Sequence, residues 1–171
     1  MNRTVAAYLV ILAGALLWCA SIVVVPFLAH IGGGASFWAD ILREPFHRVC
    51  HQLDGRSLHL WGEPLAVCSR CSAIYFAFLA GTLLYPLFRD VRRPRSPSRT
   101  LLVLALIPML LDVALGVTGL SEVTTNSRLV TGTLFGLLIP FVVLPVALGA
   151  VNERHAQPTI LVHQPKGPVD A

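Results

Sequence analysis

Cysteine and histidine residues between positions 50 and 71 are the side chains of this sequence best suited to chemistry. Cys68 and Cys71 form a Cys-x-x-Cys pair, in which the tight turn points both sulfur atoms the same way. Cys50 and His51 stand next to each other upstream of this pair. Three thiolates and one imidazole match the tetrahedral preference of zinc. We therefore predict a transition-metal site formed by these four residues, with zinc as the favoured ion.

Other uses of the same segment remain open at this stage. Adjacent residues such as Cys50 and His51 point in different directions on a helix, so His47 or His59 could replace one of them. The Cys-x-x-Cys pair could instead cycle between dithiol and disulfide, with Cys50 as resolving thiol and a membrane quinone as electron partner. A third interpretation is a structural Cys/His clip in a non-catalytic binding or transport component.

Asp112 is the most informative polar residue outside this segment, because it interrupts a long apolar stretch. A carboxylate at membrane depth is costly and normally has a partner or a function. An ion pair with Arg128 would neutralise both charges and join two helices. Alternatively, Asp112 accepts a proton or binds the metal, while Arg70 or Arg128 holds an anionic head group. We predict these three as catalytic residues. The predicted substrate-binding residues are Gln52, Arg56, Tyr75 and Asn126.

The elements that must position these residues are membrane-spanning helices. The chain of 171 residues is 55% hydrophobic and 13% charged, whereas soluble domains carry about 25% charged residues. Four apolar stretches, at 4–30, 71–88, 100–119 and 129–151, approach the roughly 20 residues that a helix needs to cross a bilayer. Unpaired backbone groups are not tolerated in lipid, so these stretches must be helical. We predict an all-α bundle of four transmembrane helices, with the Cys/His residues in a polar loop over 31–70.

Local patterns add detail to this scheme. Pro45 could open a short helix carrying Cys50 and His51. The alternating residues after Ser57 favour a short hairpin. Gly132 and Gly136, four residues apart, allow close helix–helix contact within the chain or between protomers of a homo-oligomer. The proline-containing tail over 152–171 is typical of a disordered segment.

Arginines set the predicted orientation. Five of them crowd the connection between the second and third apolar stretches: Arg89, Arg92, Arg93, Arg95 and Arg99. By the positive-inside rule this connection is cytoplasmic, which places both termini inside and the Cys/His loop outside the plasma membrane of the cell. The net charge of +4 therefore indicates topology rather than nucleic-acid binding. The expected partners are the bilayer itself and a lipid or quinone.

The polar motifs also occur together, in this order, in one family. They include the segments 50–52, 56–57, 68–71 and 74–75, Asp112, and the segments 126–128, 131–132 and 135–136. On these motifs the sequence, from about residue 45 to about residue 136, resembles the membrane proteins grouped as domain-of-unknown-function family 2085. It departs from their pattern at Ser72, where threonine is expected, and at Val113, where glycine is frequent. The resemblance implies a prokaryotic origin and a multi-span membrane fold, and it implies no particular activity.

Overall fold

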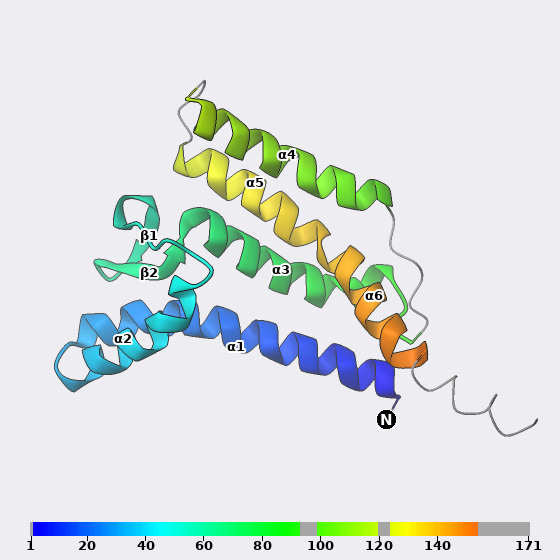
Figure 1. Ribbon diagram of the computed structural model, residues 1–171. Helices are drawn as coiled ribbons and strands as arrows, with labels where there is room; N and C mark the ends of the chain where they lie inside the picture. Colours follow the sequence, from blue (N-terminus) through cyan, green and yellow to red (C-terminus); the bar gives the residue numbers. More distant parts are fainter. Residues whose placement is uncertain (1, 93–98, 120–123, 154–171) are drawn as a thin grey trace, which may run out of the picture.

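The structure, a computed structural model, describes residues 2–92, 99–119 and 124–153. Over these ranges, four helical segments are long and apolar enough to cross a membrane. The helices, shown in Figure 1, are α1 (Arg3–Ile31), α2 (Gly34–His47), α3 (Ser69–Phe88), α4 (Arg99–Thr118), α5 (Thr125–Leu138) and α6 (Pro140–Glu153). The predicted fold, a bundle of four transmembrane helices, is confirmed. Arg93, Arg95 and most of the tail, residues 154–171, lie outside the described residues, so the predicted disorder of the tail concerns a part that is not described.

The spanning helices lie side by side in the order α1, α3, α5, α4 (Figure 1). The central helix α3 packs against both α1 and α5, while α4 packs mainly against α5. The outward side chains of α4 are large and apolar, among them Val103, Leu110 and Leu111, each at least half exposed. Lipid tails are as apolar as these side chains, so such a surface costs nothing in a bilayer.

The last span consists of two helices. A single helix was expected over 129–151, but α5 ends at Leu138 and α6 begins at Pro140. Proline has no backbone N–H and clashes with the preceding turn, which explains the break. At the other end α5 begins at Thr125, where the hydroxyl of Thr124 accepts a hydrogen bond from the Ser127 N–H at 3.2 Å.

Glycines bring α3 and α5 into close contact. A Cβ atom added to Gly132 would lie 2.8 Å from the Arg70 carbonyl oxygen, and one added to Gly81 would lie 2.6 Å from the Leu137 carbonyl oxygen. A Cβ atom on Gly136 would press against the backbone of Ile74. Gly132 and Gly136 thus serve helix packing within the chain. A homo-oligomer, which these glycines also suggested, stays a prediction.

The segment between α1 and α3 is folded rather than an open loop. It contains α2, a short 3₁₀ turn (Asp54–Arg56) and the antiparallel strands β1 (Ser57–Leu60) and β2 (Glu63–Cys68). The hairpin expected after Ser57 is therefore present. We call the segment from Gly34 to Cys68 the cap.

The helix expected to begin at Pro45 is wrong in its position. Pro45 lies in the last turn of α2, which starts at Gly34 and ends before Cys50. Ala39, Leu42 and Phe46 recur at helical spacing, and all three face the protein interior. This inward face explains why the helix forms upstream of the proline.

An apolar core fixes the cap to the ends of α1 and α3. Phe46 and Cys50 of the cap are buried with Ile22 and Val25 of α1. Trp18 of α1 packs its ring edge-on against Phe46, with 4.7 Å between ring centroids. The cap is thereby held where α3 begins.

Candidate metal centre

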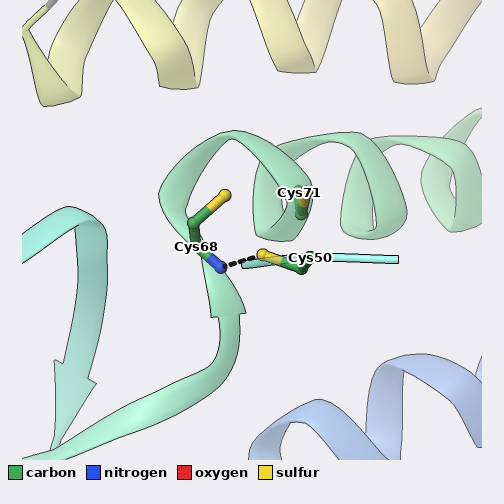
Figure 2. Close-up of side chains that lie close together, drawn as sticks. All are labelled: Cys50, Cys68 and Cys71. Carbon is green, nitrogen blue, oxygen red and sulfur yellow. Dashed lines mark hydrogen bonds between the residues drawn. The ribbon is translucent and has the colours of Figure 1, made fainter. Parts of the chain in front are cut away.

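Three of the four predicted metal ligands lie together where the cap meets α3. The Sγ atoms of Cys50, Cys68 and Cys71 all lie within 4.8 Å of one another (Figure 2). Sulfur atoms around a tetrahedral zinc ion, with bonds of about 2.3 Å, are about 3.8 Å apart. A contraction of roughly 1 Å would therefore close three sulfur atoms around one ion. The local fold supplies this arrangement because Cys68 is the N-cap residue of α3 and Cys71 follows within its first turn.

His51 does not belong to this compact sulfur group. Its side chain is exposed, whereas the neighbouring Cys50 is only 6% exposed and points into the core. Adjacent residues were expected to point in different directions, and these two side chains do lie in different environments. His51 still lines the cavity described below.

Backbone N–H groups hold Cys50 in place. Its Sγ atom accepts hydrogen bonds from the backbone N–H of Cys68 at 3.2 Å, drawn in Figure 2, and of Gln52 at 3.5 Å. Gln52 adopts a left-handed backbone conformation, with φ of 50°, and its side-chain amide donates to the Arg43 carbonyl oxygen at 3.2 Å. These contacts fix the chain on both sides of Cys50. The cysteine therefore reaches the start of α3 without a covalent link.

The site makes the Cys68 thiol more acidic. Cys68 is the last residue of β2 and lies outside the spanning helices. A hydrogen bond from the Cys71 thiol, assisted by backbone N–H groups of the first turn of α3 and by Cys50, lowers the pKa of Cys68 to about 5. Burial acts in the opposite direction but does not prevail. The site therefore favours the thiolate form of Cys68, which is the form that binds metals and attacks disulfides.

A cavity of about 660 Å³ adjoins the three cysteines. All of the predicted site residues except Tyr75 and Asn126 line it. The rest of its lining is apolar apart from one glycine and was not anticipated from the sequence: Val49, Leu53, Val113, Gly116 and Val117. These residues carry no chemical motif, so only the fold reveals their place. The cavity is where the cap, α3, α4 and α5 come together.

Tyr75 and Asn126 are not brought to the cavity. The Tyr75 ring packs edge-on against Trp18, with 5.7 Å between centroids, in the apolar core beneath the cysteines. Asn126 is exposed in the first turn of α5. Their predicted contacts with a substrate therefore have no support from this geometry.

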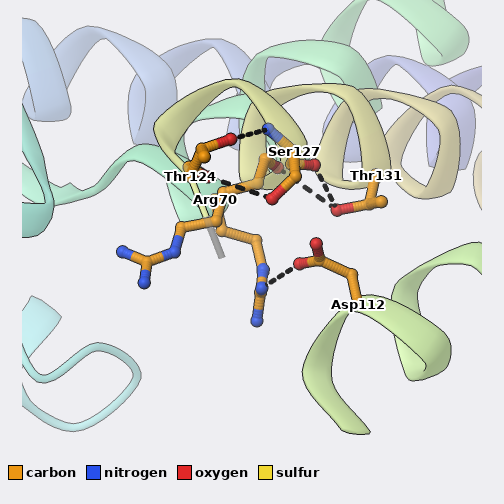
Figure 3. Close-up of polar contacts among 6 residues, drawn as sticks. Arg70, Asp112, Thr124, Ser127 and Thr131 are labelled. Carbon is orange, nitrogen blue, oxygen red and sulfur yellow. Dashed lines mark hydrogen bonds and ion pairs between the residues drawn. The ribbon is translucent and has the colours of Figure 1, made fainter. Parts of the chain in front are cut away.

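Asp112 pairs with Arg70, so the predicted ion pair with Arg128 is wrong. The guanidinium of Arg70, from the first turn of α3, donates to the Asp112 carboxylate on α4 (Figure 3). The physical reason is the close contact at Gly132, where the absence of a side chain lets the backbone of α3 at Arg70 lie against α5. The two side chains are 20% and 10% exposed. The pair ties α3 to α4 within the cavity lining.

Breaking this pair is expected to destabilise the fold measurably. Asp112→Asn leaves the largely buried Arg70 guanidinium without its counter-charge, which should cost on the order of 1–3 kcal/mol. Asp54→Asn is the matched control, because Asp54 pairs with His59 at 3.0 Å while 76% exposed. It should cost less than about 1 kcal/mol. Thermal unfolding of both variants in detergent measures the difference, and equal shifts would contradict the assignment.

Comparison with known proteins places the chain in a family. Residues 50–142, more than half of the chain, match the family model described as "Predicted membrane protein (DUF2085)". An uncharacterized protein of Methanocaldococcus jannaschii is 34% identical over 150 residues, which cover 86% of this chain and 96% of that protein. No solved structure shows a significant match. The matched region includes every cysteine of the cluster, both helix N-termini beside the cavity, and Asp112. The chain belongs to the DUF2085 family of predicted membrane proteins.

Proposed function

We propose that this chain is a membrane metalloprotein that binds one transition-metal ion, zinc being favoured, through Cys50, Cys68 and Cys71. The observation that carries the proposal is the approach of the three Sγ atoms within 4.8 Å of one another beside a cavity. Catalytic zinc sites typically have three protein ligands and leave the fourth position to water or substrate, whereas structural sites have four protein ligands. Three cysteines that line a cavity fit the catalytic arrangement better.

The surrounding residues support an enzyme that acts on a lipid-soluble or periplasmic substrate. A metal ion in this place would polarise a substrate oxygen or activate a bound water molecule. Asp112 lines the same cavity and can hold a proton, while Arg70 keeps its carboxylate oriented. The apolar lining from α4 lies within a span, so a substrate dissolved in the bilayer has a route to the cavity.

The proposal includes the side of the membrane on which the site lies. The arginine-rich connection between α3 and α4 favours the cytoplasm for that end, which places the cap outside. A fluorescent protein fused after Arg95 should be bright and alkaline phosphatase fused there inactive, because phosphatase folds only outside the cytoplasm. Fusions after Gly55, in the cap, should behave in the reverse way. Phosphatase activity at Arg95 would overturn the assignment of sides.

Metal binding by the purified full-length protein tests the proposal. We expect one ion per chain after equilibration with zinc, and thiolate-to-metal absorption after exchange for cobalt(II). The thiols of the cluster should resist alkylation while metal is present and react after a chelator is added. Cys19 serves as an internal reference, since it is buried in α1 apart from the cluster. Absence of stoichiometric metal, with thiols that react equally with and without chelator, would refute the proposal.

A thiol–disulfide oxidoreductase is the second candidate, and the lowered pKa of Cys68 favours it. In that reaction the Cys68 and Cys71 thiols form a disulfide, and their two electrons and two protons convert a quinone to a quinol. Metal-free reduced protein mixed with a water-soluble quinone should then lose two thiols per chain. Unchanged thiols would exclude this candidate. If the thiols are inert and no metal binds, the third interpretation is left, in which the Cys/His residues form a structural clip in a non-catalytic component.

A further inference from the structure

The cavity beside the cysteines has an excess of positive charge. Arg56, Arg70 and Arg128 line it, and Asp112 is the only carboxylate among its described lining residues. Asp112 balances one guanidinium, Arg70, through their ion pair. Arg56 and Arg128 form no ion pair within the described ranges. With the Cys68 sulfur counted as a thiolate beside Asp112, the three guanidiniums still outnumber the negative groups among the described lining residues by one. This balance indicates a site for a negatively charged ligand.

Two helix N-termini add to this charge. Arg70 lies in the first turn of α3 and Arg128 in the first turn of α5, and both residues line the cavity. The N-terminal end of a helix has a partial positive charge and N–H groups without partners in the helix. Such ends bind phosphate and carboxylate groups. Some N–H groups of both first turns already have acceptors, the Cys68 sulfur in α3 and the Thr124 hydroxyl in α5. The helix ends therefore contribute partial positive charge, and the guanidiniums contribute the donors for a ligand.

Some N–H donors of these arginines have no acceptor in the described structure. The Nε atom of Arg70 is buried and has no hydrogen-bond partner in the described structure, although its Nη2 atom binds Asp112. A buried N–H group without a partner is costly. Arg128 is half-buried and forms no ion pair with any carboxylate of the described ranges. A ligand oxygen in the cavity would satisfy donors that the protein leaves open.

Part of the cavity lining is apolar. Val113, Gly116 and Val117 of α4 belong to this apolar part of the lining, together with Leu53 and Val49 of the cap. Val117 is 82% exposed, although it lies in the last turn of a spanning helix. An apolar side chain this exposed on a spanning helix suits contact with lipid tails. The cavity thus combines cationic groups with apolar residues that suit the bilayer.

We propose that this cavity binds a phosphate group, and that the head group of a phosphate-bearing lipid suits both the cationic and the apolar residues of its lining. Three guanidiniums provide more donors than the two oxygens of a carboxylate accept, whereas a phosphate monoester offers three terminal oxygens. The inference deepens the proposed function by naming its substrate class, and its link to catalysis depends on that function. The charge argument itself does not depend on the metal.

Lipid binding to the purified full-length protein in detergent tests the inference. The probe is short-chain phosphatidic acid, and diacylglycerol with the same chains is the matched lipid without phosphate. Arg128→Gln should weaken phosphatidic acid binding about tenfold, the usual effect of losing one charge-assisted contact. Arg48→Gln is the control, because Arg48 is exposed near the cluster but does not line the cavity. It should change the dissociation constant less than about twofold.

Asp112→Asn gives a test of opposite sign. The substitution removes the only described carboxylate of the cavity and frees the Arg70 guanidinium. Binding of phosphatidic acid should therefore tighten, by roughly threefold or more. If Arg128→Gln does not fold, Arg56→Gln replaces it, since Arg56 is exposed and lines the cavity. A purely structural role for these arginines predicts no change in lipid affinity in any variant that folds.

The outcomes separate the inference from the proposed function. Competition by inorganic phosphate would show that the phosphate group alone is the ligand, and arginine-dependent binding without such competition would show that the lipid is required. Equal affinity for phosphatidic acid and diacylglycerol, or displacement by oleate as effective as by phosphatidic acid, would overturn the inference. Zinc is measured in the same samples. Phosphate binding without zinc refutes only the metal function, and zinc without phosphate binding refutes only this inference.

Discussion

Cys50→Ser is expected to reduce the zinc content of the purified protein from one ion per chain to less than about a tenth, after dialysis against a weak chelator. Cys50 supplies the third sulfur atom, and the Cys-x-x-Cys pair alone offers only two. A serine hydroxyl remains protonated at neutral pH and is a poor ligand for zinc. Because changes in residues that merely support a metal ligand already cost 10–100-fold in affinity, loss of a ligand should cost about a hundredfold or more. Metal analysis of the dialysed protein measures the effect.

Cys19→Ser is the matched control for this experiment. Cys19 is only 4% exposed, lies in α1 outside the sulfur group, and donates to the Tyr75 carbonyl oxygen at 3.4 Å. A serine hydroxyl can make the same hydrogen bond, so this variant should fold and keep its zinc. Full zinc content in Cys50→Ser would contradict the metal site. Equal loss of zinc from both variants would show a general effect of serine substitution on folding instead.

Gly136→Leu is expected to cause the largest loss of stability. Gly136 is buried where α5 crosses α3, and an added Cβ atom would lie 2.8 Å from the Ala77 Cβ and press on the Ile74 backbone. Backbone atoms cannot move aside as flexible side chains do, so the helices must separate. Overpacking in cores costs about 1–3 kcal/mol, and a leucine against backbone should exceed this range. The unfolding temperature in detergent, or the yield of monodisperse protein, measures the effect.

Gly149→Leu provides the control, because no atom lies within 4 Å of a Cβ added at Gly149. This variant should unfold near the temperature of the unchanged protein. Zinc content should fall together with stability in Gly136→Leu, since α3 carries Cys71 and begins directly after Cys68. Normal stability in Gly136→Leu would contradict the close packing of α3 on α5.

The spans and many of the residues that line the cavity could be predicted from the sequence. Long apolar stretches permit only helices in a bilayer, and the Cys-x-x-Cys pair was correctly expected at the start of a span. Asp112 was expected to have either a partner or a function, because an isolated carboxylate there would be too costly, and the structure gives it a partner in Arg70. These inferences follow from the chemistry of single residues in lipid.

The remaining features depend on how the helices pack, which the sequence does not specify directly. Arg70 rather than Arg128 reaches Asp112 because α3 lies against Gly132. His51 is exposed while Cys50 is buried because Cys50 packs with the inward face of α2 and with the strand β2. The apolar part of the cavity lining that contains Val113 and Val117 has no sequence signal at all, since any lipid-facing helix contains such residues.

X-ray absorption at the zinc edge of the purified, zinc-loaded protein tests the central claim most directly. The three cysteines predict three sulfur neighbours at about 2.3 Å and one lighter atom, the position left for water or substrate. The spectrum of Cys50→Ser should lose one sulfur neighbour if any zinc stays bound. A shell made only of nitrogen and oxygen atoms at about 2.0–2.1 Å would contradict the assignment of Cys50, Cys68 and Cys71 as the metal ligands.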